Sequence, residues 1–254
     1  MIRPGPVKDL LSGPWIGHPV HPMLTDVPIG AWMSALVADV TGHDDAARTL
    51  IGAGVLAAIP TAVTGLNDLS DTTDKPARAL GVAHALGNST ALTLFASSWF
   101  ARKRGNVGTG RALSFGAAAI AMGSAFLGGH LVYRRGLGVD NTAFDSDVSA
   151  WTAVLRDEEL IEAHPRKVTV KNTDVLLYRA KDQVYALANR CTHRGGPLHK
   201  GRIEGDTVMC PWHLSCFRLD DGSIVRGPAT APQRVFEARV RDGNVEIRTP
   251  QRSS

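Results

Sequence analysis

The chain has 254 residues, which is enough for one large domain or for two modest domains with buried cores. Its net charge of +4 is modest and many of the cations flank apolar runs, so the sequence carries no signal for nucleic-acid binding. Three clustered cysteines are too few for a disulfide-stabilised secreted scaffold. The mean hydropathy of −0.05 conceals two unlike halves, because the long uncharged runs all precede residue 150.

The first half is predicted to be a transmembrane domain over residues 1–135, with residues 1–22 as an interfacial lead-in. The expected spans are 23–40, 49–66, 79–101 and 112–133, and the last three reach the ~18–20 apolar residues that cross a bilayer as a helix. The first span is the weakest, because Asp26 and Asp39 bound its uncharged part. Small residues at regular spacing in the later spans favour close helix packing in lipid. The sequence therefore predicts an all-α four-helix bundle, and a soluble domain of buried helices is the alternative.

The second half is predicted to be an all-β domain. Residues 136–150 contain Gly, Asp and Ser and are expected to form a linker. From Trp151 onward apolar and polar residues alternate with a period of two, and turn pairs such as Asp221-Gly222 and Asp242-Gly243 separate the runs. We expect a small antiparallel domain over residues 151–250.

Two short arms in the β half each offer one cysteine and one histidine. They read Cys191-Thr-His193 and Cys210-Pro-Trp-His213. A structural zinc site usually takes arms of two like ligands, whereas a two-iron cluster with unlike ends needs two thiolates on one iron and two imidazoles on the other. The arms therefore predict a [2Fe–2S] cluster held by Cys191 and Cys210 at one end and by His193 and His213 at the other. Zinc is the alternative.

These arms, in their wider context, resemble the Rieske family. The matching segments are Cys191-Thr-His-Arg-Gly-Gly-Pro-Leu198, Cys210-Pro-Trp-His-Leu-Ser-Cys-Phe217 and Gly227-Pro-Ala-Thr230, and the resemblance covers residues 151–249. It implies a β-sandwich that carries a smaller cluster-binding subdomain, with the ligands on two loops at its tip. It also implies that the histidine end of the cluster is exposed to partners.

The sequence departs from the quinol-oxidising members of the Rieske family near both arms. Gly196 and Trp212 stand where those proteins have a disulfide, and Phe217 replaces a Tyr whose hydroxyl donates to a cluster sulfur. Ser215 matches the second hydroxyl donor and is expected to tune the cluster. Fewer donors leave the reduced cluster less stabilised, so the pattern resembles low-potential ferredoxins and oxygenase components. Leu214 replaces the usual Gly after the second histidine, and the sequence gives no reason for it.

The membrane half resembles an uncharacterised bacterial membrane-domain family over roughly residues 14–140. The motifs that carry the resemblance are His18-Pro-Val-His21-Pro and Asp26-Val-Pro-Ile-Gly30. With four spans, most histidines of this half fall near the face to which the β domain is attached. His84 and His130 are candidate axial ligands of a b-type haem, or lining residues of a quinone pocket. The alternative is that they only form hydrogen bonds within the bundle.

Together these features predict a membrane-anchored one-electron carrier in the bacterial inner membrane, with a redox-protein donor and acceptor. The alternatives are an electron-supplying subunit of a membrane oxidoreductase fed by quinol or haem, and a redox sensor. No substrate-transforming active site is apparent, because few residues follow Arg248 where an oxygenase would carry its catalytic domain. Basic residues divide evenly between the two faces. The segment Arg102-Lys-Arg104 lacks the adjacent arginine pair of an export signal, which favours a cytoplasmic β domain.

Overall fold

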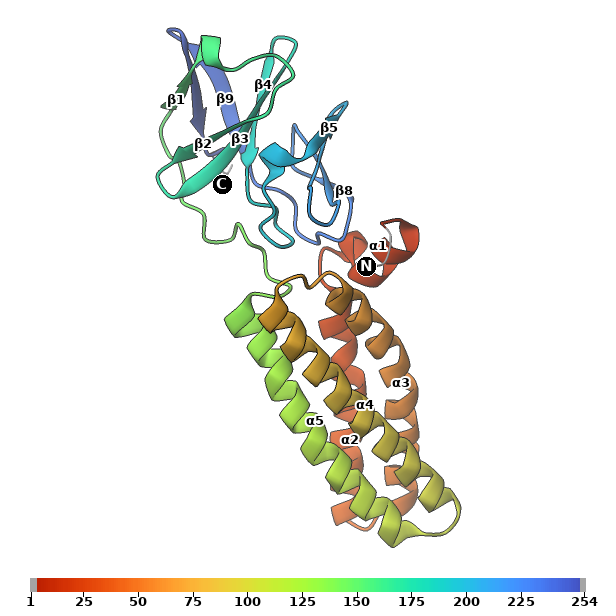
Figure 1. The fold of residues 1–254 in the computed structure, drawn as a ribbon. Helices are drawn as coiled ribbons and strands as arrows, with labels where there is room; N and C mark the ends of the chain where they lie inside the picture. Colours follow the sequence, from red (N-terminus) through yellow and green to blue (C-terminus); the bar gives the residue numbers. More distant parts are fainter. Residues whose placement is uncertain (1–3, 252–254) are drawn as a thin grey trace. The chain divides into compact units, whose positions relative to one another are not determined.

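The computed structural model describes residues 4–251 and divides into two compact units. One is a helical unit of residues 19–137, and the other is a β unit that combines residues 138–251 with the N-terminal residues 4–18. Figure 1 shows the long helices of the first and the strands of the second. The predicted class, apolar helices followed by an all-β domain, is confirmed.

The helical unit contains four long helices. They are α2 (Val20–Val40), α3 (Asp44–Ser70), α4 (Lys75–Lys103) and α5 (Val107–Arg135). Each exceeds its expected span. Helices α3, α4 and α5 continue through the charged residues at which the expected spans stop, and α2 begins three residues earlier than expected. At the start of α4, Asp74 caps the helix by accepting a hydrogen bond from the backbone N–H of Ala77 at 2.9 Å. Cations at the end of α4 are favourable for the helix dipole.

The helices form two hairpins, α2 with α3 and α4 with α5, around a core of small and aromatic residues. Trp32 stacks on Phe95 with ring centroids 4.3 Å apart. Near the far end of the same helices, Arg102 forms a two-point ion pair with Asp39 at 2.7 and 2.8 Å. Both charged side chains are buried, and Ser98 shares the site by accepting a hydrogen bond from Nε of Arg102.

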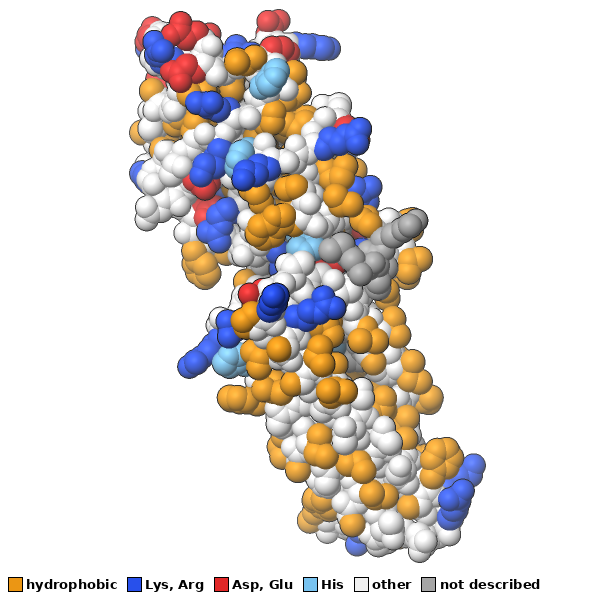
Figure 2. All heavy atoms as spheres, in the orientation of Figure 1, with side chains coloured by type: hydrophobic (Ala, Val, Ile, Leu, Met, Phe, Trp, Pro, Cys, Tyr) orange, Lys and Arg blue, Asp and Glu red, His pale blue; other side chains and the backbone are white. Residues whose placement is uncertain are grey.

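Large apolar side chains are exposed on each of the four helices. Figure 2 shows hydrophobic side chains along the visible face of this unit, and Leu56, Leu86 and Phe126 are among the exposed ones. Within residues 4–251, helices α2, α3 and α5 are long and apolar enough to cross a membrane. Helix α4 has the length but carries more polar residues, so the four-span count remains a prediction.

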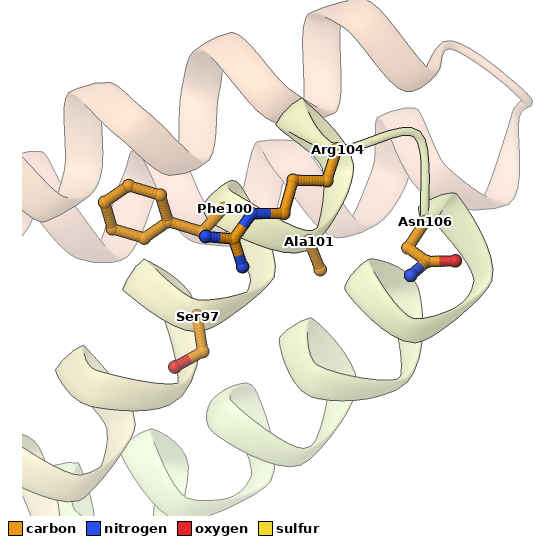
Figure 3. Close-up of a pocket in the computed structure, with 5 residues that line it drawn as sticks. All are labelled: Ser97, Phe100, Ala101, Arg104 and Asn106. Carbon is orange, nitrogen blue, oxygen red and sulfur yellow. The ribbon is translucent and has the colours of Figure 1, made fainter.

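A shallow depression lies at the turn between α4 and α5. Its lining residues come from the end of α4 and from the turn before α5 (Figure 3), and they are Ser97, Phe100, Ala101, Arg104 and Asn106. These side chains include one cation and no pair of titratable groups. We assign no site to it.

The β unit contains two antiparallel sheets. The larger has the order β1-β10-β9-β4-β3-β2, and the smaller has the order β5-β6-β7-β8. The strands of the larger sheet are β1 (Thr152–Arg156), β2 (Arg166–Val170), β3 (Thr173–Ala180), β4 (Gln183–Ala188), β9 (Val235–Arg241) and β10 (Asn244–Arg248). Those of the smaller sheet are β5 (Arg202–Glu204), β6 (Thr207–Met209), β7 (Cys216–Arg218) and β8 (Ile224–Arg226).

Strand β3 is buried on both faces and so joins two cores. Val175 and Leu177 face the core of the larger sheet, whereas Leu176 and Tyr178 face the core of the smaller one. This alternation follows from the two-residue period of a strand. The second core also contains the cysteines of the two arms, so the packing of β3 supports the candidate site directly.

Two segments expected elsewhere belong to the β unit. The lead-in forms a short helix α1 (Pro6–Ser12) and a turn η1 (Pro14–Ile16), and Asp9 of α1 accepts a hydrogen bond from Gly227 N at 3.0 Å. In the expected linker 136–150, Val148 is buried in the core of the larger sheet. Asp9 thus pairs a backbone N–H of the β domain, and Val148 covers part of its core. Residues 1–3 of the lead-in lie outside the described residues.

Candidate functional site

The four candidate ligands lie on two loops. One loop joins the larger sheet to the smaller one, and the other joins two strands of the smaller sheet. Residues 189–201 connect β4 to β5, and residues 210–215 connect β6 to β7. In each loop the backbone N–H of the cysteine donates a hydrogen bond to a carbonyl five residues later. Cys191 N donates to Gly196 O at 2.9 Å, and Cys210 N donates to Ser215 O at 2.8 Å. Both loops therefore turn tightly around a cysteine.

The two cysteine side chains meet inside the β unit. Cys191 and Cys210 are each 1% exposed and belong to the same core. The interaction between the two thiols lowers the pKa of the Cys210 thiol to about 7 and raises that of Cys191. Two sulfurs this close are suited to bind one metal ion as thiolates.

The two histidines also meet. The ring centroids of His193 and His213 are 4.9 Å apart, with the ring planes nearly perpendicular. Burial, followed by the positive charges of Arg194, His213 and Lys8, lowers the pKa of His193. The imidazole is therefore neutral at physiological pH, which is the form that binds a metal.

The side chains thus form a sulfur pair and a nitrogen pair. A cluster of two irons with unlike ends requires two thiolates on one iron and two imidazoles on the other, and the two pairs offer these donors.

Gly196 makes room for the sulfur pair. A Cβ atom added at this position would lie 2.6 Å from Sγ of Cys210 and 3.2 Å from the ring of Trp212. Any side chain here would therefore displace a candidate ligand. Trp212 is half-exposed beside the site, so the position that a disulfide occupies in quinol-oxidising relatives is filled by an indole ring.

Ser215 and Phe217 differ in what they offer the site. Ser215 is fully buried and its Oγ accepts a hydrogen bond from Ala229 N at 3.0 Å. Because the oxygen is used as an acceptor, its proton remains available to donate. Phe217 is also fully buried, in the same core as Cys191 and Cys210, and has no hydroxyl.

The structure explains why Leu214 is unusual. Its φ of +64° lies in the left-handed region that favours glycine. Its carbonyl accepts a hydrogen bond from Arg226 at 3.2 Å, and the same guanidinium nitrogen lies 3.3 Å from Sγ of Cys216. Burial raises the pKa of the Cys216 thiol, so this third cysteine is a poor nucleophile and behaves as packing.

Two polar residues that sequence reasoning missed hold the first loop. Gln233 is buried, donates to the carbonyls of Ala188 and Arg190 at 2.6 and 2.7 Å, and accepts from Thr192 N at 3.2 Å. Asn141, in the expected linker, donates to the carbonyl of His193 at 3.1 Å. No local motif marks either residue, because both act on backbone groups far away in the sequence.

The two histidines differ in exposure. His213 is 3% exposed, and His193 is only half-buried. Helix α1 lies on the Gly227 loop and brings the buried Lys8 close enough to His193 to affect it electrostatically. The exposure of the histidine end of a bound cluster to partners stays a prediction.

The histidines of the helical unit are paired differently from the sequence expectation. His84 faces His21 of α2, with ring centroids 6.5 Å apart. His130 lies further along α5, beyond the backbone carbonyl of Ser124 that accepts from His84 at 2.8 Å. The structure brings His84 together with His21 and not with His130.

A β-sandwich that carries a smaller sheet, with paired cysteines and paired histidines on two loops, defines a Rieske-type iron–sulfur protein. Residues 150–237 match the family model described as Rieske [2Fe-2S] domain, and the chain belongs to this family. Residues 17–141 match the model described as Predicted membrane protein (DUF2231). The two matches correspond closely to the β and helical units.

Several characterised relatives match the β unit. The "Ferredoxin CarAc" of Metapseudomonas resinovorans is 33% identical over 98 residues, which are 38% of this chain and 92% of that protein. The "3-phenylpropionate/cinnamic acid dioxygenase ferredoxin subunit" of Photorhabdus laumondii is 34% identical over 35% of this chain and 86% of its own length. Among solved structures, the ferredoxin of carbazole 1,9a-dioxygenase from Nocardioides aromaticivorans IC177 is 24% identical, covers 40% of this chain and all of its own, and has a TM-score of 0.38.

Proposed function

We propose that this chain is a membrane-anchored one-electron carrier whose [2Fe–2S] cluster is bound by Cys191, His193, Cys210 and His213. The observation that carries the proposal is the meeting of two thiols and of two imidazoles as separate pairs on two loops. The cluster, when bound, supplies one-electron oxidation and reduction. The four side chains fill the coordination of both irons, so no open metal position is left for a substrate.

The partners proposed are redox proteins rather than small molecules. The matched relatives are named as ferredoxins and as ferredoxin subunits of dioxygenase systems, which supports an electron-donating role toward a separate oxidoreductase. The missing disulfide and the missing Tyr hydroxyl at Phe217 support a potential toward the lower end of the roughly −150 to +300 mV Rieske range.

The helical unit is proposed to anchor the carrier in the bacterial inner membrane through four spans. The exposed apolar side chains of the four helices and the match to a predicted membrane-protein family support this anchoring. A Rieske domain on the cytoplasmic face would meet soluble redox partners there. Quinol as an electron source has no specific observation in its favour.

A potentiometric titration of the detergent-purified full chain tests the proposal. We expect two irons and two acid-labile sulfides per chain, and a one-electron Nernst curve followed by EPR of the reduced cluster. His213→Ala should abolish the signal. His199→Ala is the matched control, because His199 lies in the same unit but bonds to Asn189 instead of joining either pair. Stoichiometric zinc without iron, from cells grown with ample iron, would refute the proposal.

A further inference from the structure

The helical unit is built from two copies of one hairpin. Helices α2 and α4 end, and helices α3 and α5 begin, at positions that are 63 residues apart in the sequence. The turns agree as well, since Gly42 and Gly105 occupy equivalent places with φ of +79° and +83°. Helix ends and turn geometry that recur at one fixed sequence offset indicate an internal repeat.

Residues that are equivalent in this repeat contact one another along the centre of the bundle. Three such contacts are Trp32 with Phe95 at 4.3 Å, Asp39 with Arg102 at 2.7 Å, and His21 with His84 at 6.5 Å between ring centroids. Two equivalent groups that touch lie beside the axis relating the copies. The axis therefore runs between α2 and α4, and the two histidines face each other across it. In secondary transporters built from repeats, substrate sites lie at the interface between the repeats.

Each histidine is oriented by its own hairpin in the same way. Nδ1 of His21 lies 2.9 Å from the carbonyl oxygen of Thr61, and Nδ1 of His84 lies 2.8 Å from that of Ser124. Thr61 and Ser124 are equivalent in the repeat. Because a carbonyl only accepts, each Nδ1 carries the proton and each Nε2 carries a lone pair. The amide of Asn88 lies 3.0 Å from Nε2 of His84, so this amide must turn away when that lone pair binds a metal.

Equivalent glycines hold both rings against the neighbouring helices. A Cβ atom added at Gly65 would lie 2.7 Å from Cε1 of His21, and one added at Gly128 would lie 3.0 Å from Cε1 of His84. Imidazoles that ligate metals are typically fixed by such a second hydrogen bond and by packing. Both copies of the hairpin thus retain a histidine, its carbonyl acceptor and its glycine contact.

We propose that His21 and His84 are the two axial ligands of a haem iron bound at the interface between the two hairpins. Two imidazoles on opposite sides of one metal, with metal–nitrogen bonds of ~2.0–2.1 Å, have ring centroids ~6.4 Å apart. The observed separation is 6.5 Å. The proposal does not depend on the cluster in the β unit.

The donor set points to haem rather than to a free metal ion. No third His, Cys, Asp or Glu within residues 4–251 joins this pair at one metal position. A divalent ion held by two neutral imidazoles among apolar helices would keep its full charge at a high cost. A tetrapyrrole supplies four further nitrogens and two negative charges, so two neutral axial imidazoles are sufficient. Such an iron has no open position and is suited to electron transfer.

The test is haem content of the full chain, purified in detergent from cells supplied with a haem precursor. We expect about one haem per chain by pyridine haemochrome assay, with the optical spectrum of a low-spin, bis-histidine iron. His21→Ala and His84→Ala should each lose most of the bound haem and leave the EPR signal of the cluster unchanged. Added imidazole should restore a low-spin spectrum to His21→Gly, because free imidazole can enter the vacated space.

Two matched variants make the test specific. His43→Ala changes a histidine at the α2–α3 turn, outside the pair, and should keep the haem. His130→Ala separates the pair proposed here from a pair of His84 with His130, and should also keep it. Wild-type protein with a full cluster signal but no haem, even after incubation with haemin, would overturn the proposal. So would loss of haem in His130→Ala, or another metal bound by the pair without haem.

Discussion

Among the residues around the candidate cluster site, Ser215 and Phe217 lie where hydroxyl groups would control its potential. Both are fully buried, and only Ser215 has a proton to donate. A donor to a ligand or cluster sulfur stabilises the reduced cluster, which is more negative than the oxidised one. We therefore expect the side chains near the sulfurs to set the potential and the ligands to set the cluster type.

Phe217→Tyr should raise the midpoint potential. The new hydroxyl would lie in the core that holds Cys191 and Cys210, where a sulfur is its available acceptor. One added hydrogen bond corresponds to roughly 30–60 mV, or ~0.7–1.4 kcal/mol for one electron. Redox titration of the two proteins measures the shift, with Phe217→Leu as the control for altered packing. A Tyr variant with the wild-type potential would show that position 217 does not reach the sulfurs.

Lys8→Met should lower the midpoint potential. The Lys8 side chain is 1% exposed and acts electrostatically on His193, so its positive charge favours the reduced cluster. We expect a decrease of roughly 30–100 mV, which is ~0.7–2.3 kcal/mol for one electron. Lys8→Arg, which keeps the charge, should stay within the wild-type range. Equal potentials in the Met and wild-type proteins would contradict this role of α1.

Leu214→Gly should stabilise the β unit. A non-glycine residue at φ of +64° costs ~1–2 kcal/mol, whereas glycine costs ~0.5–1 kcal/mol in unfolded-chain entropy. The free energy of unfolding should rise by about 0.5–1 kcal/mol. Unfolding by denaturant, followed by the loss of cluster absorbance, measures this change. Leu214→Ala keeps the backbone strain and should show no such gain. Destabilisation by the glycine would mean that the half-exposed leucine side chain makes a contact worth more than the strain.

At the scale of elements, the strongest patterns of the sequence were enough to predict the architecture. The long uncharged runs predicted helices, and the Cys/His arms with the two-residue alternation predicted a Rieske-type β domain. Helix ends were underestimated because charged residues such as Asp74 and Lys103 belong to the helices as caps and final turns. The docking of α1 and of residues 138–150 on the β unit depends on hydrogen bonds between residues far apart in the sequence, which leave no periodic pattern.

The pairing of His84 was also beyond the sequence reasoning. The predicted depth in the membrane places several histidines near the same membrane face. It does not show which helices lie opposite one another in the bundle. The 63-residue repeat resolves this, because it makes His21 the equivalent of His84. The repeat has few identical residues and is recognised mainly by its shared helix ends and turns.

The buried ion pair between α2 and α4 provides a test of the repeat axis. Asp39→Asn should destabilise the helical unit by about 3–5 kcal/mol, because Arg102 would remain buried without its counter-charge. Exchanging the charges, with Asp39→Arg and Arg102→Asp together, should recover part of that loss because the two positions are equivalent. Thermal unfolding in detergent compares the variants. An exchanged protein no more stable than Asp39→Asn would argue against equivalence.

At the scale of the whole molecule, four spans would place the α2–α3 and α4–α5 turns on one side of the membrane. Cysteines introduced at His43 and Asn106 should then react with an impermeant maleimide from the periplasmic side of spheroplasts. A cysteine at the exposed Phe144 of the β unit should react only after lysis. The three native cysteines are buried and give little background. Labelling of positions 43 and 106 from opposite sides would refute the four-span arrangement.

The proposed electron carrier combines a cluster domain and a membrane domain in one chain. A cluster signal that stays with the membranes therefore reports on both domains. The measurement that tests this most directly is EPR spectroscopy of washed membranes from cells that express the full chain. After carbonate washing and reduction with dithionite, the membranes should retain the signal of a histidine-ligated [2Fe–2S] cluster, and His213→Ala membranes with equal protein should lack it. A signal found only in the soluble fraction, or an unchanged signal in His213→Ala, would contradict the account.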